Sequence, residues 1–525
     1  MNHQKIAASL SNSGRQSWRL PAELFKTGEK YYIFDANRVN FLEVNEVIFK
    51  IISILKHTPK NLHALAEALP GCSVREIRDA IGEIEEIQNQ GYLKPYDFQR
   101  AVPYTIEDIK KNISSKLESL YLNITSKCNL SCSYCVFGGG YENQNKLHQQ
   151  EMTWDTAQKA IDFFLPQARK EGQLRLDFFG GEPLLAFPLM KRIVSRMKKK
   201  IYQRNQELLI AVATNGTVLT DEIIDFLIRH NVLFQVSIDG EKEIHDANRK
   251  FKKSNIGTFD TILKNLQRIY DRNADYFLEW VRLKAVITKK SLDTTGTDFF
   301  SVPLIKTLRD HNRFSIIDKT PHYNLKKDRD FFSRIHKLGE SLLQKRDVST
   351  IEDLLNDLNY KKKNLFHLTF YEFFQVQVMN SIHLDLNQPV PFIKDCMIGI
   401  EGCVNTDGSI SVCYKSGTFI IGNVLENTWY FDKIAEFHKK RYRWTRCKNC
   451  FVQRFCMLCY EKLNGKEGLL EASIRSFCEF NRYYYRLIFE YMLKVLEKNP
   501  DLWNEPQRIA ENHVEILIEM ETGEK

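Results

Sequence analysis

Residues 115–345 alternate between strand-like and helix-like runs, and this alternation constrains the fold more than any other feature of the chain. Apolar residues recur at helical spacing in 153–165 and 221–229, for example. Strands are expected at 119–125, 174–179, 207–213, 233–238, 280–287 and 313–318. Alternating strands and helices are typical of a parallel sheet. We therefore predict an α/β fold, a partial (β/α)6 barrel that binds its ligand at the carboxyl ends of the strands.

A CxxxCxxC arrangement, Cys128, Cys132 and Cys135, follows the first predicted strand. Iron–sulfur clusters usually take four cysteines, so three thiolates would hold a [4Fe-4S] cluster with one iron left open. Two other interpretations are weighed against iron. Zinc favours CxxC pairs from two separate knuckles, and disulfides are typical of small secreted chains.

Tight turns follow the next predicted strands. Gly180, Gly181 and Glu182 follow the second strand, and Asn215 follows the third. Ser237 and Asp239 end the fourth strand, and Arg249 comes shortly after them. Glycine lets the backbone approach a ligand closely, which favours a binding role for these turns. For Asp239, His245 and Asp246, a local role in capping and loop stabilisation is at least as good an interpretation as contact with a ligand.

The C-terminal part of the chain carries a second group of cysteines. Its members are Cys396, Cys403, Cys413, Cys447, Cys450, Cys456, Cys459 and Cys478. The run from Val404 to Val412 predicts a hairpin that turns at Asp407-Gly408. Eleven of the 12 cysteines fall in the two groups, which indicates metal binding more than disulfides. A zinc ribbon is the alternative for the CxxC pairs.

The first 105 residues predict a small winged-helix-like domain. A hairpin is expected over 31–44, followed by short helices at 47–55, 62–69 and 74–88. Residues 1–100 carry 13 Lys and Arg against 12 Asp and Glu, which disfavours a nucleic-acid partner. The polar N-terminus lacks the apolar core of a signal peptide, and no run is apolar enough to span a membrane. We therefore expect a cytoplasmic protein with no membrane contact.

The octapeptide that begins at Cys128, together with the turns at Gly180 and Ser237, resembles the radical SAM enzymes. This resemblance implies that S-adenosylmethionine (SAM) chelates the open iron and is cleaved to a 5′-deoxyadenosyl radical. It places Tyr134 beside the adenine, Ser237 at the ribose and Arg249 at the methionine carboxylate. It also implies that Gly180, Gly181, Glu182, Asn215 and Asp239 take part in cofactor binding.

The second cysteine group is similar to the SPASM domain, which implies two auxiliary [4Fe-4S] clusters and three clusters in all. One auxiliary cluster would take Cys396, Cys403, Cys413 and Cys459. The other would take Cys447, Cys450, Cys456 and Cys478. The N-terminal domain resembles PqqD-like precursor-recognition domains, which implies that a leader peptide adds to the edge of its sheet. The expected domains are 1–105, a barrel at 115–345, a bridge at 346–394, the SPASM-like part at 395–485, and a helix and tail at 486–525.

Together these resemblances imply a maturase that installs a thioether or carbon–carbon cross-link in a ribosomally made precursor peptide. Its partners would be that peptide and an external one-electron reductant of flavodoxin or ferredoxin type. One alternative is an anaerobic sulfatase-maturating enzyme that forms formylglycine. Those enzymes generally carry an aspartate after the cysteine that matches Cys413, where this chain has Tyr414. The other alternative is a zinc-containing winged-helix regulator.

Overall fold

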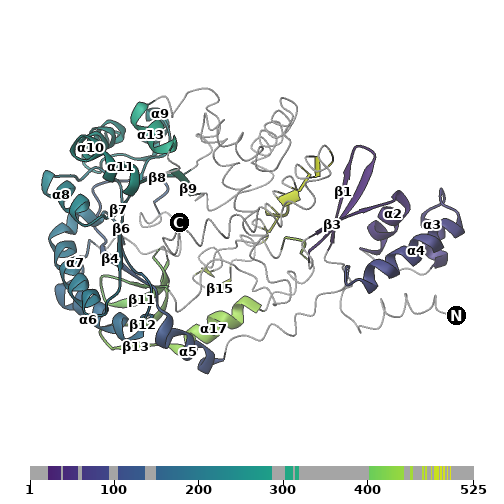
Figure 1. Cartoon of the computed structure of the whole chain (residues 1–525), viewed down its shortest axis with the longest axis horizontal. Helices are drawn as coiled ribbons and strands as arrows, with labels where there is room; N and C mark the ends of the chain where they lie inside the picture. Colours follow the sequence, from purple (N-terminus) through teal and green to yellow (C-terminus); the bar gives the residue numbers. More distant parts are fainter. Residues whose placement is uncertain are drawn as a thin grey trace.

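A computed structural model gives the architecture of the chain (Figure 1). It describes residues 22–36, 40–56, 62–93, 105–135, 149–286, 302–310, 314–317, 401–414, 416–442, 450–452 and single residues or short stretches between 464 and 497. Within these residues, no helix is long and apolar enough to cross a membrane. The expected bridge at 346–394 lies outside them.

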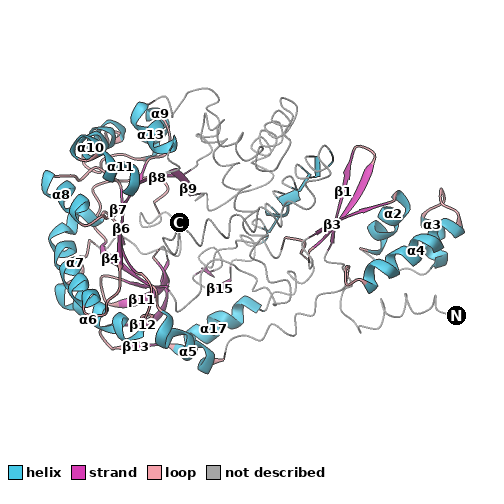
Figure 2. Cartoon of the chain, in the orientation of Figure 1, coloured by secondary structure: helices cyan, strands magenta, loops and turns pink. Residues whose placement is uncertain are grey.

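The N-terminal unit is a three-stranded antiparallel sheet followed by three helices (Figure 2). Its elements are β1 (Ala22–Thr27), β2 (Lys30–Asp35), β3 (Asn40–Val44), α2 (Glu46–Leu55), α3 (Leu62–Ala68) and α4 (Val74–Asn89). The predicted hairpin and the three helices are confirmed. The structure adds a third strand, β1, which pairs with β2. Ser73 and Glu76 form a capping box, which explains why α4 starts at Val74.

The C-terminal part of the chain contacts this N-terminal unit. Described residues between 475 and 497 are helical, and we call them the late helical segment. Phe489 in this segment is buried, and its ring centroid lies 4.4 Å from that of Phe34 and 6.0 Å from that of Phe25. Arg486 Nη1 donates to Glu23 Oε1 at 2.6 Å, and its Nη2 donates to the Leu24 carbonyl at 3.1 Å. The edge of β1 is therefore contacted by side chains from the far end of the chain.

The second unit is built on a ten-stranded sheet in the order β13-β12-β11-β10-β4-β5-β6-β7-β8-β9. The strands from β4 to β9 are parallel to one another, which confirms the predicted parallel sheet. These six strands are β4 (Ser119–Thr125), β5 (Leu174–Gly180), β6 (Leu208–Thr214), β7 (Leu233–Ser237), β8 (Val281–Val286) and β9 (Phe314–Ile317). Each lies within two residues of its predicted range at both ends.

Helices cover one face of this sheet, as Figure 1 shows. The α-helices of this unit before β10 are α5 (Ile106–Lys116), α6 (Trp154–Phe164), α7 (Phe187–Tyr202), α8 (Asp221–Arg229), α9 (Lys242–Asn248), α10 (Phe259–Arg272), α11 (Ala274–Trp280) and α13 (Pro303–Asp310). Short 3-10 helices lie at Leu165–Gln167 and Pro183–Ala186. Alternate strand residues such as Leu122, Ile124, Phe234 and Val236 are buried in the same core as the helices. The remaining strand residues face the opposite side, which we call the inner face.

The C-terminal cysteine-rich part extends the same sheet. Its elements are β10 (Glu401–Val404), β11 (Ser409–Cys413), β12 (Ser416–Asn423), β13 (Thr428–Trp429), α17 (Phe431–Tyr442), β14 (Asn464–Gly465) and β15 (Gly468–Leu469). β10 lies parallel to β4, whereas β11, β12 and β13 follow in antiparallel order. The predicted hairpin at Asp407-Gly408 is confirmed, and Gly408 adopts the left-handed conformation with φ +84°.

Candidate functional site

We call the segment after β4 that carries Cys128, Cys132 and Cys135 the cysteine loop. Cys128 lies three residues after the end of β4, at the carboxyl edge of the parallel sheet. The Cys128 thiol accepts a hydrogen bond from the Leu130 N–H at 3.4 Å and lies 3.9 Å from Asn215 Nδ2. Burial, with further contributions that include Cys132 and Cys135, raises the pKa of Cys128 to about 12. Burial likewise raises the pKa of Cys132. Cys132 and Cys135 therefore lie close enough to Cys128 to affect its ionisation.

Three cysteine thiols are ligands of the kind that a four-iron cluster takes. In the parts of the chain that the structure describes, no three His, Cys, Asp or Glu side chains converge closely enough to hold one ion. A cluster does not require such convergence, because each cysteine binds a different iron of the cubane. Metal binding releases the thiol protons, so iron would replace the protons that burial favours in the metal-free chain.

The turn after β5 holds one side of the cysteine loop. The Gly181 N–H donates to the Thr125 carbonyl, and the Glu182 N–H donates to the Lys127 carbonyl, both at 2.8 Å. A Cβ atom on Gly180 would lie 2.1 Å from the Thr125 carbonyl oxygen, and one on Gly181 would lie 2.2 Å from that of Lys127. The two glycines therefore permit close contact between this turn and the cysteine loop.

Glu182 connects the turns after β5 and β6. Its carboxylate is fully buried and accepts three hydrogen bonds, from the Leu184 N–H at 3.0 Å, Thr214 Oγ1 at 2.7 Å and the Asn215 N–H at 2.7 Å. Asn215 in turn donates to Asn129 Oδ1 at 2.9 Å, within the cysteine loop. Sequence reasoning missed Asn129 and Thr217, whose side chains are joined at 2.8 Å, because isolated polar residues give no pattern to detect.

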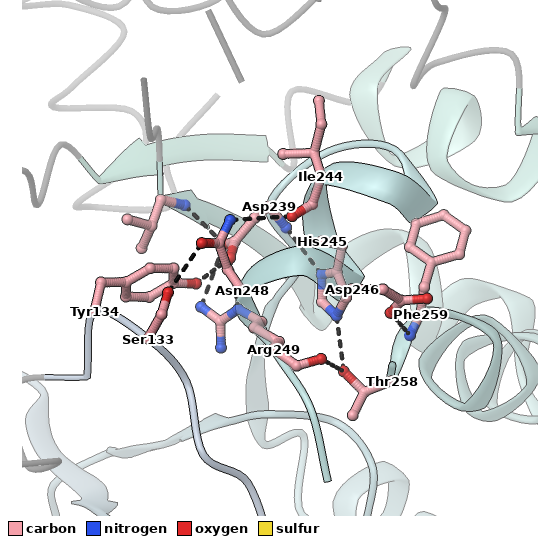
Figure 3. A network of polar contacts seen from close by, with 11 residues as sticks. Ser133, Tyr134, Asp239, Ile244, His245, Asp246, Asn248, Arg249, Thr258 and Phe259 are labelled. Atoms are coloured by element: carbon pink, nitrogen blue, oxygen red, sulfur yellow. Dashed lines mark hydrogen bonds and ion pairs between the residues drawn. The ribbon is translucent and has the colours of Figure 1, made fainter. Parts of the chain in front are cut away.

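The segment around residues 248–252 holds the other side of the cysteine loop, and this was also missed. The Ser131 N–H donates to the Lys250 carbonyl at 2.9 Å, and the Lys252 N–H donates to the Asn129 carbonyl at 2.8 Å. Ser133 Oγ donates to Asn248 Oδ1 at 2.9 Å (Figure 3). No sequence motif predicts that this segment pairs with the cysteine loop, because the pairing depends on how the chain after β7 returns to the loop.

Asp239 and Arg249 form a buried ion pair beside the loop (Figure 3). Arg249 Nε donates to Asp239 Oδ2 at 2.7 Å, and Nη2 donates to Oδ1 at 3.2 Å. Tyr134 donates its hydroxyl to the same carboxylate, and the Arg249 guanidinium lies 5.3 Å from the Tyr134 ring centroid. Burial opposes ionisation, but Arg249 outweighs it and lowers the pKa of Asp239. Within the chain, Arg249 pairs with Asp239; the contact with the methionine carboxylate of SAM that the resemblance implies stays a prediction.

His245 and Asp246 stabilise the loop around this ion pair. His245 Nδ1 accepts the Asp239 N–H at 3.2 Å, which leaves Nε2 to donate to Thr258 Oγ1 at 2.9 Å. Asp246 Oδ1 accepts the Phe259 N–H at 2.9 Å. These contacts favour the local role that the sequence left open. Ser237, the predicted ribose contact, is half-buried at the end of β7.

Acid should destabilise the fold through His245. Burial, with a contribution from Arg249, lowers the pKa of His245 to about 3. An unfolded histidine has a pKa of about 6.5, so below that pH the unfolded chain binds a proton that the folded chain does not. The free energy of unfolding should therefore fall as the pH drops from about 6.5 to about 3, by up to about 1.4 kcal/mol per pH unit.

Thermal unfolding of the iron-free chain across this pH range measures the effect. His245→Asn should give a flatter dependence of the melting temperature on pH than the wild type. The exposed His63 on α3 supplies the control, since His63→Asn should keep the wild-type slope. Equal slopes for wild type and His245→Asn would contradict the prediction.

The second cysteine group is described in part. Cys403 lies on β10, opposite Tyr121 of β4 and Ser411 of β11, and Cys413 ends β11. Burial, followed by the charge of Cys413, raises the pKa of Cys403 well above its usual value. Arg482 Nε, in the late helical segment, donates to Cys450 Sγ at 3.4 Å, and Cys478 lies in the same segment. The other four cysteines of this group, Cys396, Cys447, Cys456 and Cys459, lie outside the described residues.

The parallel sheet, the helices on one face and the cysteine loop at the carboxyl edge define the class of fold, an α/β fold with a parallel sheet. Residues 122–281 match the Radical SAM superfamily, so the chain contains a radical SAM domain. The solved structure of native anSMEcpe with bound AdoMet shares the fold, with a TM-score of 0.51 and 20% identity over 71% of this chain and 99% of that chain.

Three curated relatives are similar in sequence. An uncharacterized protein of Methanocaldococcus jannaschii is 31% identical over 176 residues, 34% of this chain, and the match spans about half of that protein's length, 55%. The cysteine-type anaerobic sulfatase-maturating enzyme of Clostridium perfringens (strain 13 / Type A) is 23% identical over 71% of this chain and 96% of that enzyme. The radical SAM cyclopropyl synthase TigE of Paramaledivibacter caminithermalis is 21% identical over 89% of this chain and 93% of that protein.

Proposed function

We propose that this protein is a radical SAM enzyme that modifies a ribosomally made precursor peptide by installing a thioether or carbon–carbon cross-link. The observation that carries the proposal is the cysteine loop at the carboxyl edge of the sheet, held by Gly181 and Glu182 on one side and by residues 248–252 on the other. Cys128, Cys132 and Cys135 would hold the cluster. SAM bound at this cluster would supply the chemistry that removes a hydrogen atom from the substrate.

The chain's own residues orient the reactants. Tyr134 and Arg249 are fixed by Asp239, so the aromatic ring and the guanidinium keep a defined position beside the loop. A cross-link removes two hydrogen atoms from the peptide, one as an atom and the other as a proton and an electron. The second cysteine group, whose Cys403 lies on the strand next to β4, would hold an auxiliary cluster, and such a cluster would supply an acceptor for that electron.

A peptide substrate is supported by the N-terminal unit. In the described residues, β3 pairs only with β2, so its outer edge is open for a further strand, whereas side chains of the late helical segment contact β1. We propose that the leader of the precursor adds to β3. Two relatives that match along most of their length are named for a sulfatase-maturating activity and for a radical SAM cyclopropyl synthase activity.

Formylglycine formation is the second candidate function, because the Clostridium perfringens maturase matches most of this chain. Tyr414 follows Cys413 here and stacks on Phe179, with ring centroids 4.1 Å apart. An aromatic ring at this position cannot accept a proton as a carboxylate would, which favours cross-linking. The zinc-regulator alternative is disfavoured by the radical SAM domain.

The test is anaerobic incubation of the iron-loaded protein with SAM, a one-electron reductant and the peptide encoded by a neighbouring short reading frame. Cross-linking should remove two hydrogen atoms from the peptide and add nothing. Formylglycine formation from cysteine would instead remove two hydrogen atoms and also replace the cysteine sulfur with oxygen. Mass spectrometry distinguishes these outcomes, and an unchanged peptide together with intact SAM cleavage would contradict the proposed substrate.

A further inference from the structure

Two buried amide side chains face the inner side of the sheet, away from the covering helices. Asn123 of β4 lies between Leu122 and Ile124, and Gln235 of β7 lies between Phe234 and Val236. All four neighbours are fully buried in the core that the helices share. Because successive strand residues point to opposite faces, Asn123 and Gln235 point to the inner face.

Each of these side chains has a carbonyl oxygen without a hydrogen-bond partner. Asn123 Oδ1 and Gln235 Oε1 are buried and accept no hydrogen bond, although Asn123 is only 6% exposed and Gln235 only 7%. Buried polar groups are normally paired, since an unpaired acceptor costs stability. Two unpaired acceptors in the radical SAM domain indicate that an external donor completes them.

The orientation of the Asn123 amide follows from a chain of hydrogen bonds that ends at a carboxylate. Ser409 Oγ donates to Asp407 Oδ1 at 2.6 Å, because an ionised carboxylate only accepts. Asn405 Nδ2 then donates to Ser409 Oγ at 3.1 Å, and Asn123 Nδ2 donates to Asn405 Oδ1 at 2.8 Å. The atom left over is the Asn123 oxygen, so the group that binds it must be a donor.

Strand register places the two acceptors in one row across the sheet. Asn123 is opposite Phe179 of β5, and Gln235 is opposite Ala213 of β6. The last register pair between β5 and β6 is Phe178 with Val212, and Phe179 and Ala213 are the next residues on these two strands. Three strand intervals of about 4.8 Å separate β4 from β7, which is roughly 14 Å along the sheet, or about four residues of extended peptide.

We propose that Asn123 and Gln235 bind backbone N–H groups of an extended peptide segment that crosses the inner face from β4 to β7. This rests on the proposed function and deepens it, since it places the segment to be modified just below the cysteine loop. Neither side chain is charged, which suits a neutral amide donor better than an ammonium group. Recognition of backbone N–H groups does not depend on the peptide's side chains, so a generic peptide can test it.

The first variant is Gln235→Leu, measured in the full iron-loaded chain with acetyl-tetraalanine amide as the probe. Equilibrium dialysis should show binding weakened by about tenfold, the effect of one lost hydrogen bond. The melting temperature without probe should stay level or rise, because an unpaired acceptor is replaced by an apolar group. A merely structural glutamine would instead lower the melting temperature and leave probe binding unchanged, which would overturn the proposal.

Tyr276→Phe is the matched control. The Tyr276 hydroxyl is also buried, but it donates to the Val232 carbonyl at 2.6 Å, among the residues packed with the helices. Its loss should lower the melting temperature and leave the dissociation constant of the probe as it is. Gln235→Met provides a second apolar replacement if Gln235→Leu does not fold.

Two further ligands separate the possible donors. A depsipeptide analogue of the probe, with esters in place of two amides, should bind the wild type more weakly than the probe does, and this difference should be smaller in Gln235→Leu, which keeps only the Asn123 acceptor. If Gln235→Leu weakens SAM binding and not probe binding, the donor is the adenine amino group and the proposal is overturned. If the variant changes neither SAM binding nor probe binding, a water molecule donates the hydrogen bond to Gln235 Oε1, and the proposal is likewise overturned. Failure of the precursor peptide to react, with the probe results as expected, would count against the proposed reaction alone.

Discussion

Replacing Cys128, Cys132 and Cys135 together by alanine should lower the iron content of the reconstituted protein from about twelve to about eight atoms per chain and abolish SAM cleavage. The three thiols lie together at the sheet edge, and cluster loss there leaves no iron to bind SAM. Iron analysis and detection of 5′-deoxyadenosine measure the two effects. Cys72→Ala removes the one cysteine outside both groups and should change neither quantity.

The same iron count tests the second cysteine group. A wild type with about four irons and stoichiometric zinc would show that this group is a zinc scaffold. The electron acceptor proposed at Cys403 and Cys413 would then be wrong, while the radical SAM domain would be unaffected.

Gly181→Ala should abolish SAM cleavage almost completely although the substitution adds a single methyl group. The new Cβ would lie 2.2 Å from the Lys127 carbonyl oxygen and 2.6 Å from its carbonyl carbon. Both are backbone atoms, so no side-chain rotation can relieve the clash. The loop and the turn after β5 must separate, which breaks the hydrogen bond from the Glu182 N–H to Lys127 and moves Cys128. Cluster absorption and SAM cleavage after anaerobic reconstitution measure the loss.

Gly82→Ala is the matched control for this substitution. Gly82 lies inside α4, and nothing lies within 4 Å of an added Cβ. The control should keep full iron content and SAM cleavage and should stabilise α4 by about 0.5–1 kcal/mol, since alanine is the better helix former. Wild-type cleavage in Gly181→Ala would show that the contact between the turn and the loop does not position the cluster.

The sheet could be predicted because its information is local. The parallel strands include short apolar runs between turns, such as Leu208–Thr214, and helical periodicity between the strands fixes the order of elements. The positions of the cysteine loop and of the turn after β5 then follow from the rule that ligands bind at the carboxyl ends of parallel strands.

What could not be predicted depends on contacts between distant segments. The pairing of β10 with β4 joins residues far apart in sequence, and neither strand has a feature that selects the other. The ion pair of Arg249 with Asp239 was likewise not predicted, because nothing in the sequence shows that the two side chains meet. The unpaired oxygens of Asn123 and Gln235 are invisible in the sequence, where polar residues inside strands suggest exposure.

The ring of Phe489 beside Phe25 and Phe34 limits how modular the N-terminal unit can be. A boundary drawn at residue 105 would separate the three-stranded sheet from the aromatic residue that covers it. A fragment of residues 1–105 would expose these rings to water and lose the contact of Arg486 with Glu23. Transplantation of this unit to another enzyme would therefore require that the late helical segment be carried along with it.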